Sequence, residues 1–342
     1  MHTAIGCRIL NKEGNIVNAV YAETCASIGM IFFAQRMLQN EPKSRYGDVM
    51  ERALYNTVLA GMSRDGKSFF YVNPLEVNPK ICDYNENYAH IKPERQRWFG
   101  CACCPPNVAR LIASLSKYIY TIREDVVYTN LYIGGRAEFE VYGKKVVLTQ
   151  ESNYPWDGYI KFKVEADEDV DFTLALRIPE WCSKFGMAVL GDLVKNEGVE
   201  NGFLKIAGTW KNGDEVEFDL AMPVLKVKGH PLIRHTYGKV ALQRGPLVYC
   251  IEEADNGAHL HQLEINTGQE FEVWEDSNFI EGMVVILGVA DKVKMDQWGD
   301  SLYRYQTNSE KEQVPIKFIP YFAWANRGLG EMQVWVNEEK GT

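Results

Sequence analysis

Residues 98–110 read Trp98-Phe99-Gly100-Cys101-Ala102-Cys103-Cys104-Pro105-Pro106-Asn107-Val108-Ala109-Arg110, and they combine three cysteines with the start of a helix. Proline is tolerated in the first turn of a helix, because the N–H group that it lacks would be unpaired there. An apolar run continues the pattern, so we expect a helix over 105–122 with Cys103 and Cys104 at its N-terminus. The dipole and free amides at such an end favour a thiolate. The stretch is therefore a candidate metal site or activated thiol.

The composition is that of a globular protein with an excess of acidic residues. The chain has 342 residues, 46% of them hydrophobic, and a net charge of −9. This charge argues against nucleic acid or an anionic membrane as a partner. No apolar run reaches the ~18–20 residues that span a bilayer, and no secretory signal opens the chain. We therefore expect a cytoplasmic enzyme or a binder of neutral ligands, with no membrane partner.

Helical patterns come first in the chain. Residues 24–39 and 45–62 carry apolar side chains at helical spacing. The loop over 74–97 is long, and long loops within a domain are often functional. Three or four helices form a thin layer, which would leave much of their apolar surface uncovered. We therefore expect either a homo-oligomer or a missing N-terminal half to cover them.

Strand patterns follow the helices. Alternating runs such as 159–164 and 215–220 recur with turns between them, which is typical of antiparallel sheets. We predict a multidomain chain, α then β, in three segments. They are a helical segment over 1–123, a β-sandwich over 124–229 and a second small β domain over 230–342.

A second group of metal-ligating residues lies upstream, in Glu23-Thr24-Cys25. Three thiolates and one carboxylate fit a tetrahedral zinc site, which Glu23, Cys25, Cys103 and Cys104 would supply. The wide separation in sequence is not that of a zinc finger, so buried free cysteines stay open as an alternative. A redox pair of Cys101 and Cys104 is a third interpretation, but it lacks the βαβ context of thioredoxin-like proteins.

Several stretches carry a resemblance to a known family. Tyr21-Ala22-Glu23-Thr24-Cys25-Ala26-Ser27 and Trp98-Phe99-Gly100-Cys101-Ala102-Cys103-Cys104-Pro105 resemble the two cysteine motifs of glycoside hydrolase family 127, the β-L-arabinofuranosidases or DUF1680 group. Gln243-Arg244-Gly245-Pro246-Leu247-Val248-Tyr249 and Trp324-Ala325-Asn326-Arg327 are similar to later parts of that family. The similarity extends from about residue 20 to the C-terminus.

The resemblance implies a fold and a set of site residues. The fold is an (α/α)6 barrel followed by antiparallel β-sandwich domains, and the cofactor is Zn²⁺ held by Glu23, Cys25, Cys103 and Cys104. Cys103 would be the nucleophile. A retaining glycosidase also needs an acid/base, which in this family is a glutamate shortly before the Glu-Thr-Cys motif. Glu13 is the carboxylate available between residues 7 and 20.

The function that the resemblance implies is hydrolysis of a glycan. We expect a retaining exo-glycosidase that releases β-L-arabinofuranose from plant-type, arabinofuranose-containing oligosaccharides. A barrel of this kind has twelve helices and this chain has about four, so the chain corresponds to the C-terminal portion of a family member, with a partial barrel. The alternative is a truncated, non-catalytic remnant that keeps the β domains and zinc but has no turnover alone.

Overall fold

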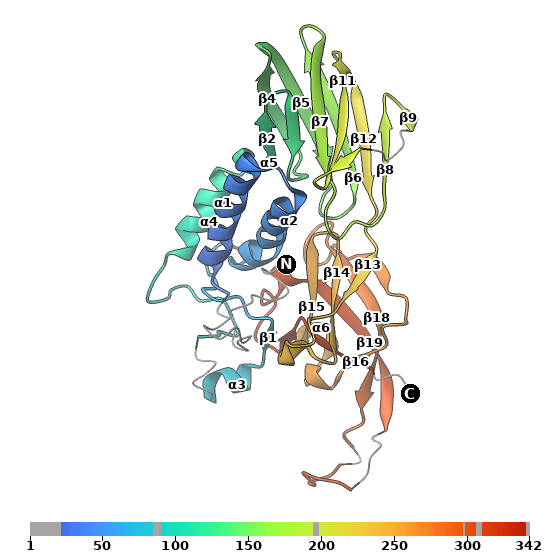
Figure 1. The fold of residues 1–342 in the computed structure, drawn as a ribbon. Helices are drawn as coiled ribbons and strands as arrows, with labels where there is room; N and C mark the ends of the chain where they lie inside the picture. The colour runs from blue at the N-terminus through green and yellow to red at the C-terminus, as the bar shows by residue number, and fades with distance from the viewer. Residues whose placement is uncertain (1–21, 85–89, 194–197, 297, 306–309, 340–342) are drawn as a thin grey trace.

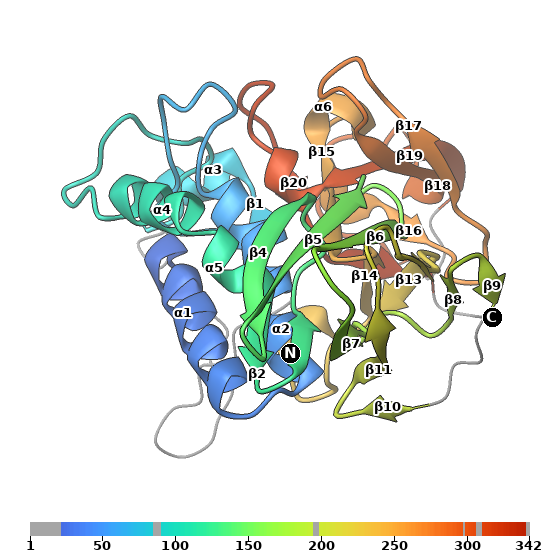
Figure 2. The same ribbon diagram turned by 90° about the horizontal axis from the view of Figure 1, so that it is seen from above.

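The structure, a computed structural model, describes residues 22–84, 90–193, 198–296, 298–305 and 310–339. Helices α1 to α5 gather on one side of the molecule, and two groups of strands, with the short α6 beside the second group, fill the rest (Figure 1). One group of strands follows these five helices in the chain, and the other holds the later strands, up to residue 338. Seen at right angles, α1 and α4 lie at the edge away from the strands (Figure 2).

The helical segment is built around α1 (Thr24–Asn40). One face of α1 buries Ile28, Ile31 and Leu38, and the helix ends just before Pro42, as expected because the residue before a proline disfavours helical geometry. The other helical elements here are α2 (Ser44–Arg52), the π-helical turn η1 (Ala53–Val58), α3 (Pro79–Tyr84), α4 (Cys104–Ala113) and α5 (Ser116–Ile119). Within the described residues, no helix is long and apolar enough to cross a membrane.

The predicted partial (α/α)6 barrel is wrong for the described part of the chain. That part holds six α-helices, of which the short α6 (Glu253–Asn256) belongs to the C-terminal segment, and its fold is mostly β. The π-helical turn η1 packs on residues 246–248 of the C-terminal segment. Asn56 donates to the carbonyl oxygen of Pro246 and accepts from the amide of Val248. The predicted helix over 105–122 is also too long, because residues 120–123 form a strand.

The middle segment contains two sheets. The first has the order β10-β11-β7-β3-β2 and the second the order β4-β5-β6-β12-β8-β9. Phe139 of the second sheet and Phe172 of the first pack edge to face at 6.3 Å, so the two sheets share one core. Their strands are β2 (Tyr120–Arg123), β3 (Val126–Thr129), β4 (Gly135–Val141), β5 (Lys144–Ser152), β6 (Tyr159–Ala166), β7 (Val170–Arg177), β8 (Phe185–Val189), β9 (Asp192–Leu193), β10 (Val199–Glu200), β11 (Phe203–Trp210) and β12 (Glu215–Leu220).

The C-terminal segment forms a ten-stranded sheet that closes on itself. Strand β14 pairs with both β15 and β21, so β15, β19, β18, β16, β21 and β14 form a closed ring. The strands are β1 (Glu76–Val77), β13 (Val224–Val227), β14 (Lys239–Arg244), β15 (Leu247–Glu252), β16 (Glu264–Ile265), β17 (Glu272–Glu275), β18 (Val284–Val293), β19 (Lys311–Pro320), β20 (Met332–Gln333) and β21 (Val336–Glu338).

This topology corrects the prediction of antiparallel β-sandwich domains. In the C-terminal segment, ring closure replaces two separate facing sheets. Two strand pairs are parallel, β3 with β7 and β16 with β21. Alternation of side chains predicts strands, but it carries no information on which distant strand becomes the neighbour.

A buried ion cluster joins the helices to the middle sheets. Arg177, at the end of β7, contacts Asp48 at 2.6 Å and also contacts Glu51, both on α2. Glu51 accepts hydrogen bonds from Tyr154 and from Trp181 as well. Burial raises the pKa of Asp48 to about 6, although the nearby Arg177 lowers it. The cluster fixes α2, and with it the helical segment, against the strands.

Candidate metal centre

The N-terminus of α4 presents two of the predicted ligands. Cys103 is the N-cap residue, Cys104 is the first helical residue, and the two prolines occupy the first turn. The prediction that these cysteines lie at a helix N-terminus is confirmed. Cys104 is buried and Cys103 is half-buried. A helix start places free amides and the positive end of the helix dipole beside both thiols.

The N-terminus of α1 presents the other two. Glu23 is the N-cap residue of α1 and pairs with Val72 in an isolated antiparallel bridge, and Cys25 follows in the first turn. Between them, the Thr24 amide donates to the carbonyl oxygen of Tyr71 at 3.0 Å, and its hydroxyl donates to that of Phe70 at 2.9 Å. These bonds hold Glu23 and Cys25 at a set position relative to residues 70–72.

The two helix starts meet, so the structure brings all four predicted ligands together. The Sγ atom of Cys25 lies 3.4 Å from that of Cys103 and 3.7 Å from that of Cys104. The Sγ atoms of Cys103 and Cys104 are 3.9 Å apart, and Glu23 Oε1 lies 3.7 Å from Cys103 Sγ. One ligand atom from each residue falls within a group no wider than 4.8 Å.

These distances fit a tetrahedral cation with sulfur ligands. Zn–S bonds of about 2.3 Å at tetrahedral angles place sulfur atoms about 3.8 Å apart. The three sulfur separations of 3.4, 3.7 and 3.9 Å bracket that value. A carboxylate oxygen beside three sulfurs completes four ligands. The cluster therefore matches a site for one metal ion, as the sequence predicts.

The electrostatics of the cluster favour a cation. Burial, together with the neighbouring Cys25 and Cys103, raises the pKa of the Cys104 thiol well above its usual range. A thiol in such surroundings stays protonated at neutral pH unless a positive charge compensates the thiolate. A bound dication supplies that charge, because a coordinating thiol is deprotonated.

One other predicted residue lies apart from the cluster, and another falls outside the part of the chain that the structure describes. Cys101 is exposed and is not one of the four grouped residues. Glu13, the predicted acid/base, lies outside the described residues.

Sequence reasoning missed Arg95, which packs on Phe70, the residue whose carbonyl oxygen accepts the Thr24 hydroxyl. Arg95 is 7% exposed and donates hydrogen bonds to the carbonyl oxygens of Ala60 and Trp324 at 3.0 and 2.7 Å. Its guanidinium lies 4.6 Å from the ring centroid of Phe70, and Phe70 stacks on Trp324 at 4.7 Å. An arginine within Pro93-Glu94-Arg95-Gln96-Arg97 has the sequence context of an exposed loop residue. No local signal marks it as buried.

The fold and the site define a β-rich protein that carries, on two helix starts, a glutamate–cysteine cluster that could hold a metal ion. Three family models match this chain: the β-L-arabinofuranosidase GH127 catalytic domain over residues 11–117, the GH127 middle domain over 126–222 and the family 127 C-terminal domain over 224–337. The chain belongs to glycoside hydrolase family 127.

Individual relatives agree with this assignment. A non-reducing end β-L-arabinofuranosidase from Bifidobacterium longum is 37% identical over 328 residues, which are 93% of this chain and 49% of that protein. The crystal structure of Ara127N-Se, a GH127 β-L-arabinofuranosidase from Geobacillus stearothermophilus T6, is 48% identical with a TM-score of 0.92, covering 95% of this chain and 51% of the other. The GH127 β-arabinofuranosidase BT3674 is 37% identical with a TM-score of 0.83 and similar coverage, 95% and 51%. This chain spans about half the length of these relatives.

Proposed function

We propose that this chain carries the nucleophile and the zinc site of a retaining exo-glycosidase that releases β-L-arabinofuranose from plant-type glycans. The observation that carries the proposal is the convergence of Glu23, Cys25, Cys103 and Cys104 within 4.8 Å. Membership of family 127 and the β-L-arabinofuranosidase activity of the relatives support the same substrate class. The proposed ligand is an arabinofuranose-containing oligosaccharide.

In this proposal Cys103 acts as the nucleophile. Its position as the N-cap of α4 places it at the start of the helix, half-buried, whereas Cys104 is buried. The Cys103 thiolate attacks the anomeric carbon of the sugar, the glycosidic C–O bond breaks, and a sugar–sulfur bond forms. Water then attacks the same carbon, releases the sugar and regenerates the thiolate. Bound zinc would keep the thiol ionised at neutral pH.

The leaving oxygen needs a proton, and the attacking water must lose one. A carboxyl group in the acid/base role does both in turn. Glu13 is our candidate for this role.

We also propose that the chain is organised in three segments, 1–123, 124–229 and 230–342, and the three separate family models support this division.

Turnover and zinc content, measured on the same purified chain, test the proposal. The substrate is a chromogenic β-L-arabinofuranoside, and zinc is quantified per chain before and after chelation. We expect turnover with about one zinc per chain, lost on chelation and restored by zinc. Zinc without turnover would instead favour the non-catalytic alternative. A chain with neither would contradict the proposed site.

A further inference from the structure

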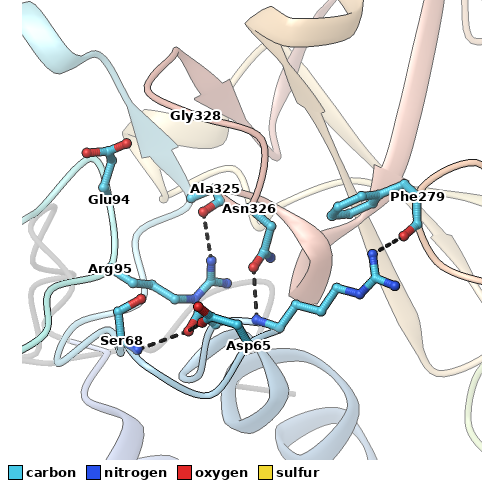
Figure 3. A pocket seen from close by; sticks show the side chains of 10 residues that line it. Asp65, Ser68, Glu94, Arg95, Phe279, Ala325, Asn326 and Gly328 are labelled. Atoms are coloured by element: carbon cyan, nitrogen blue, oxygen red, sulfur yellow. Dashed lines mark hydrogen bonds between the residues drawn. The ribbon is translucent and has the colours of Figure 1, made fainter.

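A cavity of about 690 Å³ lies between the helical segment and the C-terminal segment, separate from the four ligands of the metal centre. The turn over 63–68 forms one wall, Glu94 and Arg95 a second, and the loop over 325–328 with Phe279 a third. Figure 3 shows Glu94 and Phe279 at opposite ends of this cavity, with Asp65, Arg95 and Asn326 between them. Its size is within the range of small-molecule sites, roughly 300–1,000 Å³.

The walls of the cavity are held in place by contacts between the two segments. The Arg64 amide donates to Asn326 Oδ1 at 3.0 Å, and the Arg64 guanidinium contacts the carbonyl oxygen of Phe279. On the other side, Arg95 donates to the carbonyl oxygens of Trp324 and Ala325 at 2.7 and 3.1 Å. The cavity is therefore formed by contacts between the helical segment and the C-terminal segment.

The charges that line the cavity select a neutral ligand. Two guanidinium groups, Arg64 and Arg95, face two carboxylates, Asp65 and Glu94, so the formal charges cancel. An anion would meet the carboxylates, a cation would meet the two guanidinium charges, and an apolar ligand would cover the carboxylates without donating a hydrogen bond to them. The Arg95 guanidinium, the Arg64 amide and the Asn326 side chain already bond within the protein. Hydroxyl groups of a ligand would therefore donate to the carboxylates of Asp65 and Glu94. A polyhydroxylated, uncharged molecule fits this lining best.

The cavity lies close to the metal centre along the chain. Ser68 lines the cavity, and Val72, four residues later, pairs with Glu23. Four extended residues span at most about 14 Å, and paired strands lie about 5 Å apart, so the backbone of Ser68 is within about 20 Å of the backbone of Glu23. An extended oligosaccharide can reach from one to the other.

We propose that this cavity is a second saccharide-binding site, which takes a neutral, hydroxyl-rich segment of the glycan whose end is cleaved at Cys103. The proposal rests on the proposed function for its choice of saccharide. It assigns Glu94 and Asp65 as residues that bind the outer part of the substrate. They have no part in the chemistry at the anomeric carbon.

Binding of a neutral L-arabinofuranose-containing trisaccharide to the full chain tests this site. Isothermal titration calorimetry compares the wild type with Glu94→Gln, Asp65→Asn and the matched control Glu151→Gln, which changes an exposed glutamate on β5. Glu94 is also exposed, so its replacement spares the core. We expect each cavity variant to bind about fivefold to tenfold more weakly, with the control unchanged.

Three outcomes would overturn the proposal. They are equal affinity in all variants, no trisaccharide binding at about 10 mM, and tighter binding of inorganic phosphate than of the trisaccharide. A chromogenic monosaccharide substrate separates this site from the proposed function, because it is too short to reach the cavity. The cavity variants should turn over that substrate at the wild-type rate. If no chain turns it over but cavity-dependent binding persists, the proposed function fails and the saccharide site stands.

Discussion

The guanidinium of Arg95 donates a 2.7 Å hydrogen bond to the carbonyl oxygen of Trp324, a residue 229 positions later in the chain. Phe70 is stacked on Trp324 and also lies under Arg95. The carbonyl oxygen of Phe70 accepts the hydroxyl of Thr24, which lies between Glu23 and Cys25. Arg95, Phe70 and Thr24 thereby link the C-terminal segment to the cluster of Glu23, Cys25, Cys103 and Cys104.

Replacing Arg95 with methionine should destabilise the protein and weaken metal binding. The variant keeps a long apolar stem but loses the hydrogen bonds that Arg95 donates to the carbonyl oxygens of Ala60, Trp324 and Ala325. We expect a loss of about 3 kcal/mol in the free energy of unfolding. Urea denaturation measures this loss, and a competition assay with a chelator measures zinc affinity. Arg97→Met is the matched control, because Arg97 is exposed in the same loop. Equal stability of the two variants would refute the role of Arg95.

Cys103→Ala and Cys101→Ala should behave differently although they lie two positions apart. Cys103 belongs to the four-residue cluster, whereas Cys101 is exposed and outside it. We expect Cys103→Ala to lower turnover by at least about a thousandfold, because it removes the nucleophile. Cys101→Ala should stay near the wild-type rate. Zinc content and cadmium–thiolate absorption, measured on both variants, report the cluster independently of turnover. Equal losses in the two variants would count against the assigned roles.

Asp48 should make stability depend on pH between about 4 and 6. Burial raises its pKa in the folded protein from 3.8 to about 6, so in this window the folded state binds a proton that the unfolded chain does not. The free energy of unfolding should therefore fall as the pH rises through the window. The wild type should lose about 2–3 kcal/mol relative to Asp48→Asn. Urea denaturation at pH 4, 5, 6 and 7 measures the difference, and the neighbouring Glu51, Glu180 and Arg177 are present in both proteins. Parallel pH profiles would contradict the prediction.

Gly47→Ala should destabilise the junction between α2 and the middle sheets. A Cβ atom at position 47 would lie 2.4 Å from Cδ of Arg177, whose side chain is fully buried and held by Asp48 and Glu51. We expect a loss of about 2 kcal/mol, because the arginine has no free space to move into. Gly29→Ala is the control within α1, where an added Cβ meets nothing within 4 Å. That change should stabilise the helix by about 0.5–1 kcal/mol. Thermal unfolding of both variants distinguishes the two outcomes.

The sequence by itself determined the local elements and the four residues of the predicted metal site. Pro105 and Pro106 mark the start of α4, and alternating side chains predicted the strand Glu215–Leu220 with its observed bounds. The cysteine motifs identified the family, and the resemblance supplied the four ligands. Each of these signals lies within a few consecutive residues, where backbone preference and side-chain period act directly.

Only the tertiary structure decided how these pieces meet. It brought Cys25 to 3.4 Å from Cys103 across 78 positions, closed the C-terminal strands into a ring and packed Asn56 of η1 against the β14–β15 turn and β15. It also buried Arg95, which has an ordinary polar context in the sequence. Strand neighbours and the burial of a polar side chain depend on contacts between residues far apart in the chain, and no local pattern encodes those contacts.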